Sequence, residues 1–225
     1  MAEDVRTSEI PERFHSPHTH AMLMMAAALG LKDRYTQGHG QRVAVYSGRL
    51  AECLGLSTRE IQQITMGGLL HDIGKLALSD RIFSHCKASL TRHMQWEVRN
   101  HPVNGAKLLR RFNCSATICD MVLCHHERLD GSGYPKGLAG DDIPLGARIV
   151  GVVDCFDAIT TDRPYQRHKT RKEAFEDLAE MAGNALQADL VTAFIREIRR
   201  NGMLPPDQFD PCHASMDFPM AAAAR

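Results

Sequence analysis

The stretch Gly68-Leu69-Leu70-His71-Asp72-Ile73-Gly74-Lys75 decides the fold, because an apolar helical pattern ends there on a His-Asp pair. The pattern leading into it starts at Ser57-Thr58-Arg59-Glu60, which has the form of a capping box. Neighbouring residues on a helix point about 100° apart. His71 and Asp72 can therefore meet one ion only at a helix end or with the ion between them, and Gly74 offers such a helix end.

Helical spacing of apolar residues continues on both sides of this stretch, and strand-like alternation is nearly absent. The sequence predicts an all-α helical bundle of about seven helices. Residues 127–144 hold four glycines and two prolines and are expected to form one long loop, of a length that is usually functional in a compact domain. We expect an N-terminal arm over residues 1–18, a helical domain over 19–200 and a flexible tail over 201–225. The predicted helices are 19–31, 41–54, 57–71, 91–100, 103–112, 116–124, 147–161, 171–182 and 188–200.

Composition narrows the class of protein. The chain has 225 residues, with Lys+Arg 27 and Asp+Glu 27, so it lacks the basic excess of a general DNA-binding protein. The chain has seven cysteines, an odd number, and none of them forms a CxxC pair. This pattern favours reduced thiols over a framework of disulfide bonds. The most apolar run, residues 21–31, is too short to span a bilayer, and no basic region precedes an apolar stretch at the N-terminus. We expect a cytoplasmic protein with no membrane or DNA partner.

The histidines point to chemistry. Five of the twelve have distinctive neighbours, and with the carboxylates of Asp72 and Asp154 they form a mixed nitrogen and oxygen donor set. A mixed set of this kind is suited to binding iron or manganese, unlike a set of soft thiolate ligands. Seven side chains exceed what one ion takes, so two ions bridged by a carboxylate are expected, an arrangement that serves phosphoryl transfer. The five histidines are His39, His71, His101, His125 and His126.

The ordered string of motifs resembles one known family. His71-Asp72-Ile73-Gly74-Lys75 is followed by the loop sequence His125-His126-Glu127-Arg128-Leu129-Asp130-Gly131-Ser132-Gly133-Tyr134-Pro135 and later by Asp162-Arg163-Pro164-Tyr165. Over residues 20–200 the chain resembles the HD-GYP domain phosphodiesterases, a branch of the HD metal-dependent phosphohydrolases. The resemblance implies an HD-type helical fold. It also implies hydrolysis of the bacterial messenger cyclic di-GMP to linear pGpG, and onward to GMP in some members.

The resemblance also implies roles for single residues. Asp72 would bridge the two ions, a metal-bound hydroxide would attack phosphorus, and Lys75 would pair with a phosphate oxygen. The residues expected to contact substrate are Lys75, Gly133, Tyr134 and Arg163, although Tyr134 is as readily explained as a packing residue under the loop. Asp33 and Asp157 would orient ligands or Lys75. The metal ligands implied are His39, His71, Asp72, His101, His125, His126 and Asp154.

Some features leave alternatives open. Tyr35 stands where some members carry a glutamate that helps hold a third ion, so we expect two ions. The segments at 83–88 and 186–188, and Gln166, also depart from the family pattern. Another cyclic dinucleotide such as cyclic GMP-AMP is an alternative substrate, and a non-catalytic nucleotide-sensing adaptor is an alternative function. In the family the loop can contact diguanylate cyclase domains, and a homodimer is an open alternative for the assembly.

Overall fold

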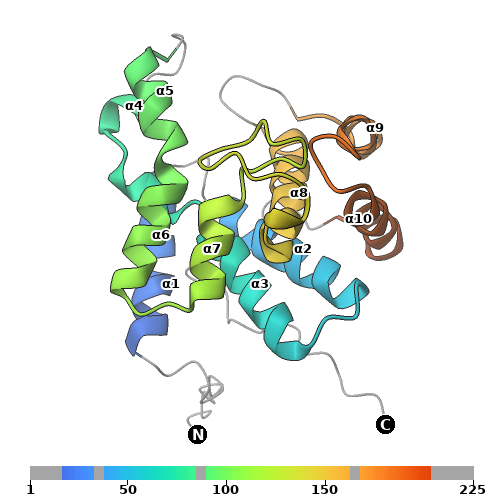
Figure 1. Cartoon of the computed structure of the whole chain (residues 1–225), viewed down its shortest axis with the longest axis horizontal. Helices are drawn as coiled ribbons and strands as arrows, with labels where there is room; N and C mark the ends of the chain where they lie inside the picture. The colour runs from blue at the N-terminus through green and yellow to red at the C-terminus, as the bar shows by residue number, and fades with distance from the viewer. Residues whose placement is uncertain (1–16, 33–37, 85–89, 163–167, 204–225) are drawn as a thin grey trace, which may run out of the picture.

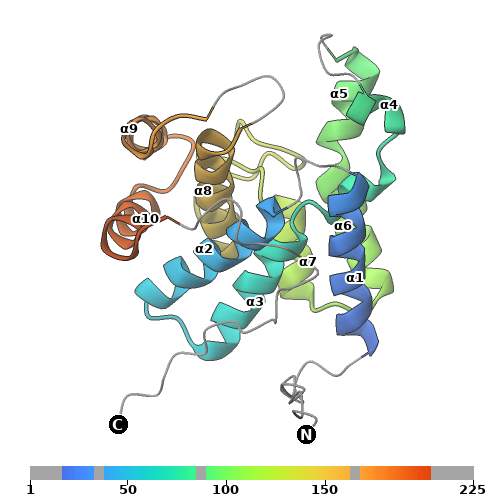
Figure 2. The same ribbon diagram turned by 180° about the vertical axis from the view of Figure 1, so that it is seen from behind.

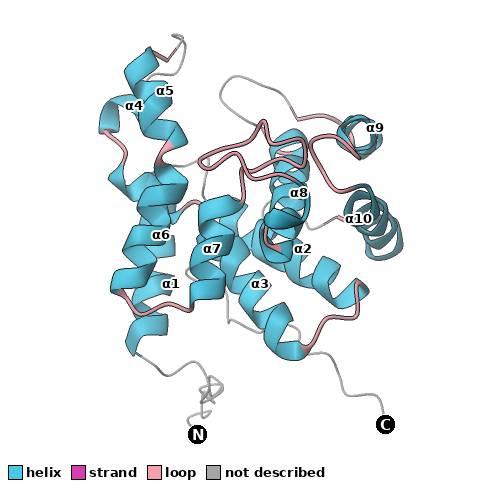
Figure 3. Ribbon diagram, viewed as in Figure 1, coloured by secondary structure: helices cyan, strands magenta, loops and turns pink. Residues whose placement is uncertain are grey.

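A computed structural model describes residues 17–32, 38–84, 90–162 and 168–203 (Figure 1). Within these residues the chain forms ten α-helices, two 3-10 helices and connecting loops, with no strand (Figure 3). The predicted all-α class is confirmed. The expected total of about seven helices was too low, because each of the nine predicted ranges overlaps an α-helix. The tenth, α4, has only five residues, too few to show a helical period. In chain order the elements are α1 Pro17–Lys32, α2 His39–Cys53, α3 Thr58–Leu70, η2 Ile73–Ala77, α4 Asp80–Ser84, α5 Arg92–Arg99, α6 His101–Arg111, α7 Ala116–Cys124, η3 Gly140–Asp142, α8 Leu145–Thr160, α9 Arg171–Met181 and α10 Ala188–Asn201.

Local chemistry sets several helix ends. The hydroxyl of Ser57 accepts the backbone N–H of Glu60, and the Glu60 carboxylate accepts the N–H of Ser57 at 2.9 Å, so the predicted capping box opens α3. A second box, between Thr170 and Glu173, opens α9. Gly55 follows α2 with a φ of 72°, the left-handed conformation that ends many helices. These signals explain why the predicted and observed helix boundaries agree closely.

The helices form a central group with a layer on either side. Helices α2, α3, α7 and α8 lie in the middle, α9 and α10 on one side, and α1, α4, α5 and α6 on the other (Figures 1 and 2). Tyr46, Phe156 and Phe194 meet edge to face at 5.0 to 5.8 Å and join α2, α8 and α10. Leu70, Ile73, Leu109 and Val122 form a second buried cluster that joins α3, η2, α6 and α7.

Gly74 acts differently from the prediction. Helix α3 already ends at Leu70, so Gly74 does not stop it. A Cβ on Gly74 would overlap the backbone carbonyl of His101 and come within 2.5 Å of the amide of Gly105. The missing side chain therefore allows η2 to lie directly against α6. This close approach brings the His71-Asp72 pair to His101.

Some predictions fall outside the described residues. Residues 1–16 and 204–225, which make up most of the predicted arm and tail, are among them, as are Asp33, Tyr35 and Arg163. In the part of the chain that the structure describes, no helix is long and apolar enough to cross a membrane.

Candidate metal centre

Five histidine side chains and two aspartates converge where the ends of several helices meet. The Nε2 atoms of His39 and His71 are 3.1 Å apart, and those of His101 and His125 are 3.3 Å apart. The ring of His126 packs against that of His125, with centroids 4.0 Å apart. The seven residues predicted as ligands are thus brought together. They fall into overlapping groups whose ligand atoms lie within 4.8 Å of one another: His39, His71 and Asp154; His71, Asp72 and His125; and His101, His125 and His126.

Three of these histidines are fixed in the same way. The Nδ1 atoms of His71, His101 and His125 lie 2.7, 2.6 and 2.8 Å from the carbonyl oxygens of the residues three positions earlier, Gly68, Val98 and Val122. A carbonyl only accepts, so each Nδ1 carries the hydrogen and each Nε2 keeps its lone pair. The carbonyls belong to the last turns of α3, α5 and α7, where helix carbonyls lack backbone partners.

The helix ends also favour a cation. The carboxyl-terminal end of a helix carries a partial negative charge. Helices α3 and α7 end immediately before His71 and His125, and α5 ends two residues before His101. At α5 the Val98 carbonyl lacks the usual helical partner for a reason visible in the sequence, because Pro102 stands four residues later and has no N–H to donate. Each histidine therefore satisfies a helix end and aims Nε2 inward at the same time.

His39 is held by a carboxylate instead. Its Nδ1 donates to Asp157 at 2.7 Å, and Arg42 donates to both oxygens of Asp157, from Nε at 2.6 Å and from Nη2 at 2.9 Å. Arg42 and Asp157 are both buried. The position of Asp157 beside a candidate ligand agrees with the expectation that it orients one. Arg42 was not predicted, and its only sequence signal is that it lies one helical turn after His39.

Asp72 lies between the two groups of histidines. Its Oδ1 is 3.2 Å from Nε2 of His101, and its Oδ2 is 3.3 Å from Nε2 of His71 and 3.6 Å from Nε2 of His39. One carboxylate thus faces both groups, which is the geometry that a bridging ligand needs. Lys75, one helical turn on, donates to Oδ2 at 2.6 Å and stays partly exposed.

The charge states of Asp72 and Asp154 favour binding of a cation at this centre. Burial raises the pKa of Asp72, but Lys75 and His71 outweigh it and hold this pKa well below its usual range. For Asp154 burial also raises the pKa, and His39 and His71 lower it further than burial raises it. Both aspartates are therefore ionised.

The histidines complete this picture. Burial holds the pKa of His125 well below its usual value and lowers that of His126 to about 4, so both imidazoles are neutral and able to bind metal. Burial also lowers the pKa of His39, but the carboxylates of Asp154 and Asp157 outweigh it and raise this pKa to about 9. His39 thus lies where the carboxylates attract positive charge, which a metal ion would supply in place of the proton. The donor set fits divalent transition metal ions.

The predicted loop starts at residue 127, after α7, and runs beside the end of α8 (Figure 3). The carboxylate of Glu127 accepts the backbone N–H groups of Lys136 at 2.7 Å and Leu138 at 3.0 Å. A Cβ on Gly133 would lie 2.6 Å from the carbonyl oxygen of His126, so only glycine lets the loop pack this closely. Tyr134 is thereby placed with its ring 4.8 Å from that of His126. The sequence indicated no role for Glu127, and the structure makes it the anchor of the loop.

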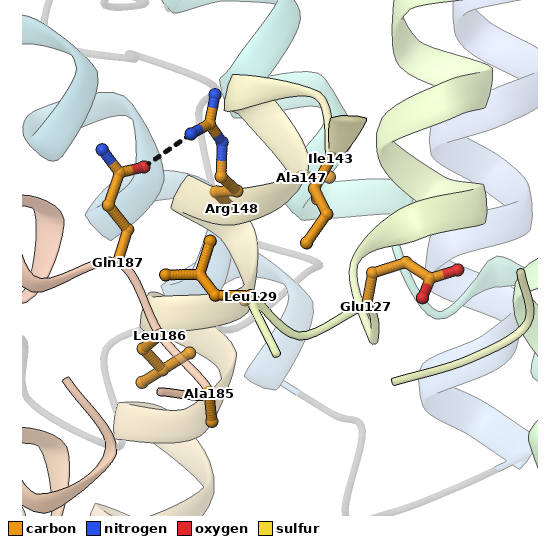
Figure 4. A pocket seen from close by; sticks show the side chains of 9 residues that line it. Glu127, Leu129, Ile143, Ala147, Arg148, Ala185, Leu186 and Gln187 are labelled. Atoms are coloured by element: carbon orange, nitrogen blue, oxygen red, sulfur yellow. Dashed lines mark hydrogen bonds between the residues drawn. The ribbon is translucent and has the colours of Figure 1, made fainter. Parts of the chain in front are cut away.

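A small pocket lies between the loop, α8 and the segment at residues 185–187 (Figure 4). Leu129, Ala147 and Leu186 line it, and Arg148 donates to the side-chain oxygen of Gln187 at 3.0 Å. Gln187 belongs to the 186–188 segment that departs from the family pattern, and this hydrogen bond ties that segment to α8. The pocket includes none of the seven candidate ligands.

Comparison with known proteins identifies the family. The family model described as "HD domain" matches residues 23–190. The chain therefore belongs to the HD domain family, which is metal-dependent, and the expected family membership is confirmed.

Its curated relatives lie within the expected branch. The chain is 37% identical over 168 residues to a cyclic di-GMP phosphodiesterase of Thermotoga maritima, covering 73% of this chain and 45% of the relative. It is 39% identical over 184 residues to a cyclic di-GMP phosphodiesterase of Pseudomonas aeruginosa, covering 80% and 43%. It is 32% identical over 213 residues to 3'3'-cGAMP-specific phosphodiesterase 3 of Vibrio cholerae, covering 92% and 45%. The chain spans less than half the length of these relatives.

Solved structures agree on the fold. A cyclic GMP-AMP-specific phosphodiesterase of V. cholerae superposes with a TM-score of 0.64 at 19% identity, covering 80% of this chain and 48% of that one. The HD domain of Listeria monocytogenes PgpH, in complex with cyclic-di-AMP, superposes with a TM-score of 0.57 at 16% identity, covering 80% and 93%. The predicted HD-type helical bundle is confirmed.

Proposed function

We propose that this chain is a metal-dependent phosphodiesterase that hydrolyses cyclic di-GMP to linear pGpG, and onward to GMP in a second cleavage. The observation that carries the proposal is the convergence of five imidazole rings and two ionised carboxylates, with Lys75 paired to Asp72 at their edge. Relatives named as cyclic di-GMP phosphodiesterases support the substrate.

His39, His71, Asp72, His101, His125, His126 and Asp154 would hold two divalent ions, with Asp72 shared between them. When bound, the ions supply Lewis acidity that activates water and offsets the charge of the phosphodiester. The chain's own contribution is to fix the donors beforehand. Three imidazoles are held by backbone carbonyls and one by Asp157, so little reorganisation is needed when the substrate arrives.

Lys75 would stabilise the charge that builds up on the phosphate. Its ammonium lies 2.6 Å from Asp72 and keeps about a fifth of its side chain exposed, so it stands between the candidate ligands and the solvent side of the centre. A cation at this edge can pair with a non-bridging phosphate oxygen as the leaving ribose oxygen departs. Asp72 holds the ammonium in place before substrate binds.

The loop would shape the substrate side of the centre. Tyr134 packs against His126, so its ring forms a wall of the centre, and burial together with the charges of Asp154 and Asp72 raises the pKa of its hydroxyl. The hydroxyl thus stays protonated and can donate a hydrogen bond. Gly133 allows the close backbone approach, and Arg163 remains a predicted phosphate contact outside the described residues.

A second substrate has a specific observation in its favour. Three relatives are 3'3'-cGAMP-specific phosphodiesterases of V. cholerae, and one of them aligns with 92% of this chain. Cyclic GMP-AMP is therefore the alternative substrate. The non-catalytic adaptor has less support, because an adaptor has no need for Lys75 beside a complete donor set.

The test is a hydrolysis assay. Purified protein is reconstituted anaerobically with iron or with manganese and incubated with cyclic di-GMP, cyclic GMP-AMP and cyclic di-AMP. We expect metal-dependent release of linear product from cyclic di-GMP, and loss of turnover in the double variant His71→Ala, Asp72→Ala. Full metal occupancy without hydrolysis of any substrate would refute the enzyme. Undiminished turnover in the double variant would refute the site.

Four further expectations belong to this proposal. The ions are iron or manganese, two per chain because Tyr35 replaces the glutamate of three-metal members. The chain acts in the bacterial cytoplasm. The loop contacts diguanylate cyclase domains, and a homodimer is one of the assemblies to be tested. Metal analysis and light scattering on the purified protein address the ion count and the assembly.

A further inference from the structure

The outer face of α5 carries two cations and an aromatic ring. Arg92, Trp96 and Arg99 are all exposed and follow the spacing i, i+4, i+7, which places them on one side of a helix. Met94, two residues from Trp96 and so on the far side, is buried. Trp96 is the only tryptophan of the chain and is 62% exposed. An exposed indole between two guanidinium groups is an unusual surface for a helix whose other face, at Met94, is already buried.

This face connects directly to the metal centre. The guanidinium carbon of Arg99 lies 4.7 Å from the centroid of the Tyr134 ring, and Tyr134 packs on His126, a candidate ligand. Arg99 is therefore held at the rim of the centre by a cation–π contact. No carboxylate in the described ranges forms an ion pair with it.

Trp96 extends the rim outward. It lies one helical turn from Arg99, about 4.5 Å along the helix axis, so both side chains can reach one nucleotide. The ring of His93 stacks on the indole with centroids 5.9 Å apart and an angle of 15°. His93 covers one face of the indole, and the high exposure of Trp96 leaves surface for a second ring to stack.

We propose that Trp96 and Arg99 form a binding subsite for the half of a cyclic dinucleotide that is not being cleaved. A purine base stacks on Trp96, and Arg99 pairs with the second phosphodiester, a geometry that guanidinium groups favour. The subsite rests on the proposed function, because it takes the part of the substrate that the metal centre cannot hold. An acidic protein segment would be the competing occupant, but the contact of Arg99 with Tyr134 ties this face to the reaction centre.

The single tryptophan provides a direct test. Trp fluorescence of the metal-loaded protein is titrated with cyclic di-GMP, with GMP and with inorganic phosphate. We expect saturable quenching by both guanine nucleotides and none by phosphate, which has no base to stack. An unchanged fluorescence in a sample that hydrolyses cyclic di-GMP would overturn the subsite and leave the proposed function standing.

Kinetics of variants give a second readout. Trp96→Ala and Arg99→Ala are each expected to raise KM for cyclic di-GMP about tenfold or more, with kcat changed less than about twofold. The metal content and the inhibition constant of inorganic phosphate should stay at wild-type values. Arg110→Ala is the matched control, since Arg110 is an exposed arginine at the far end of α6 that pairs with Asp120. An unchanged KM in both variants would overturn the proposal.

Failure of the subsite and failure of the proposed function give different results. If the wild-type protein hydrolyses no cyclic dinucleotide yet GMP and cyclic di-GMP quench Trp96, nucleotide binding at Trp96 holds and the enzymatic proposal fails. If there is neither hydrolysis nor quenching, both fail. A protein partner would be assigned to this face instead by two results together. An acidic peptide would bind without competing with nucleotide or phosphate, and nucleotide would leave the Trp96 fluorescence unchanged.

Discussion

Arg42 offers the sharpest perturbation of the candidate metal centre, because through Asp157 it holds His39, which belongs to only one of the groups of candidate ligands. It donates two hydrogen bonds to Asp157, which in turn holds His39. Lysine in its place keeps the charge but cannot supply both bonds in the same plane. Arg42→Lys is therefore expected to loosen His39 without changing the charge of the site.

The magnitude follows from the lost contact. One charge-assisted hydrogen bond to a buried carboxylate is worth roughly 1.5 to 3 kcal/mol, and changes in residues that orient ligands typically weaken metal binding about 10- to 100-fold. We expect a loss in this range at the group formed by His39, His71 and Asp154. The group formed by His101, His125 and His126 should keep its affinity, because the carbonyls that hold His101 and His125 belong to the backbone.

The assay is a chelator competition with manganese that resolves two dissociation constants, supported by metal analysis of the purified variant. One constant should rise and the other stay constant, so that the bound metal falls from two ions towards one. Arg49→Lys, on the same helix α2, is the control. Equal weakening of both constants, or of neither, would refute the idea that the Arg42–Asp157 pair serves one ion.

Three other changes test separate parts of the site. Lys75→Ala should lower kcat about 100-fold while the protein still binds metal, as checked by kinetics and metal analysis, since the lost cation acts mainly on developing charge. Glu127→Gln can accept only one of the N–H groups of Lys136 and Leu138, so the loop should lose about 1 to 3 kcal/mol of local stability, measured by hydrogen exchange. Gly74→Ala places a methyl group against His101, and thermal unfolding should show a loss of at least about 1 to 3 kcal/mol together with reduced metal content.

The sequence predicted the helices well, and the seven residues that it proposed as metal ligands lie together in the structure. Capping residues such as Ser57 and Glu60, and the left-handed Gly55, are local signals that act within one turn. The contacts that fix the ligands were less predictable, because most of them are tertiary. Arg42 and Asp157 are 115 residues apart, so no spacing in the chain links them. The role of Gly74 was also mistaken, since its reason is the backbone of α6 rather than the end of α3.

The orientation of three of the histidines nevertheless depends on local sequence. His71 and His125 come one residue after a helix and His101 two residues after one. Each donates from Nδ1 to the carbonyl three residues back, so a histidine placed just past a helix end is oriented by that helix. The same placement removes an unpaired carbonyl and directs the negative end of the helix dipole at the cation. A histidine one residue earlier or later would point its Nε2 about 100° away. Position relative to the helix end, more than the identity of distant partners, therefore turns the Nε2 atoms of these candidate ligands inward.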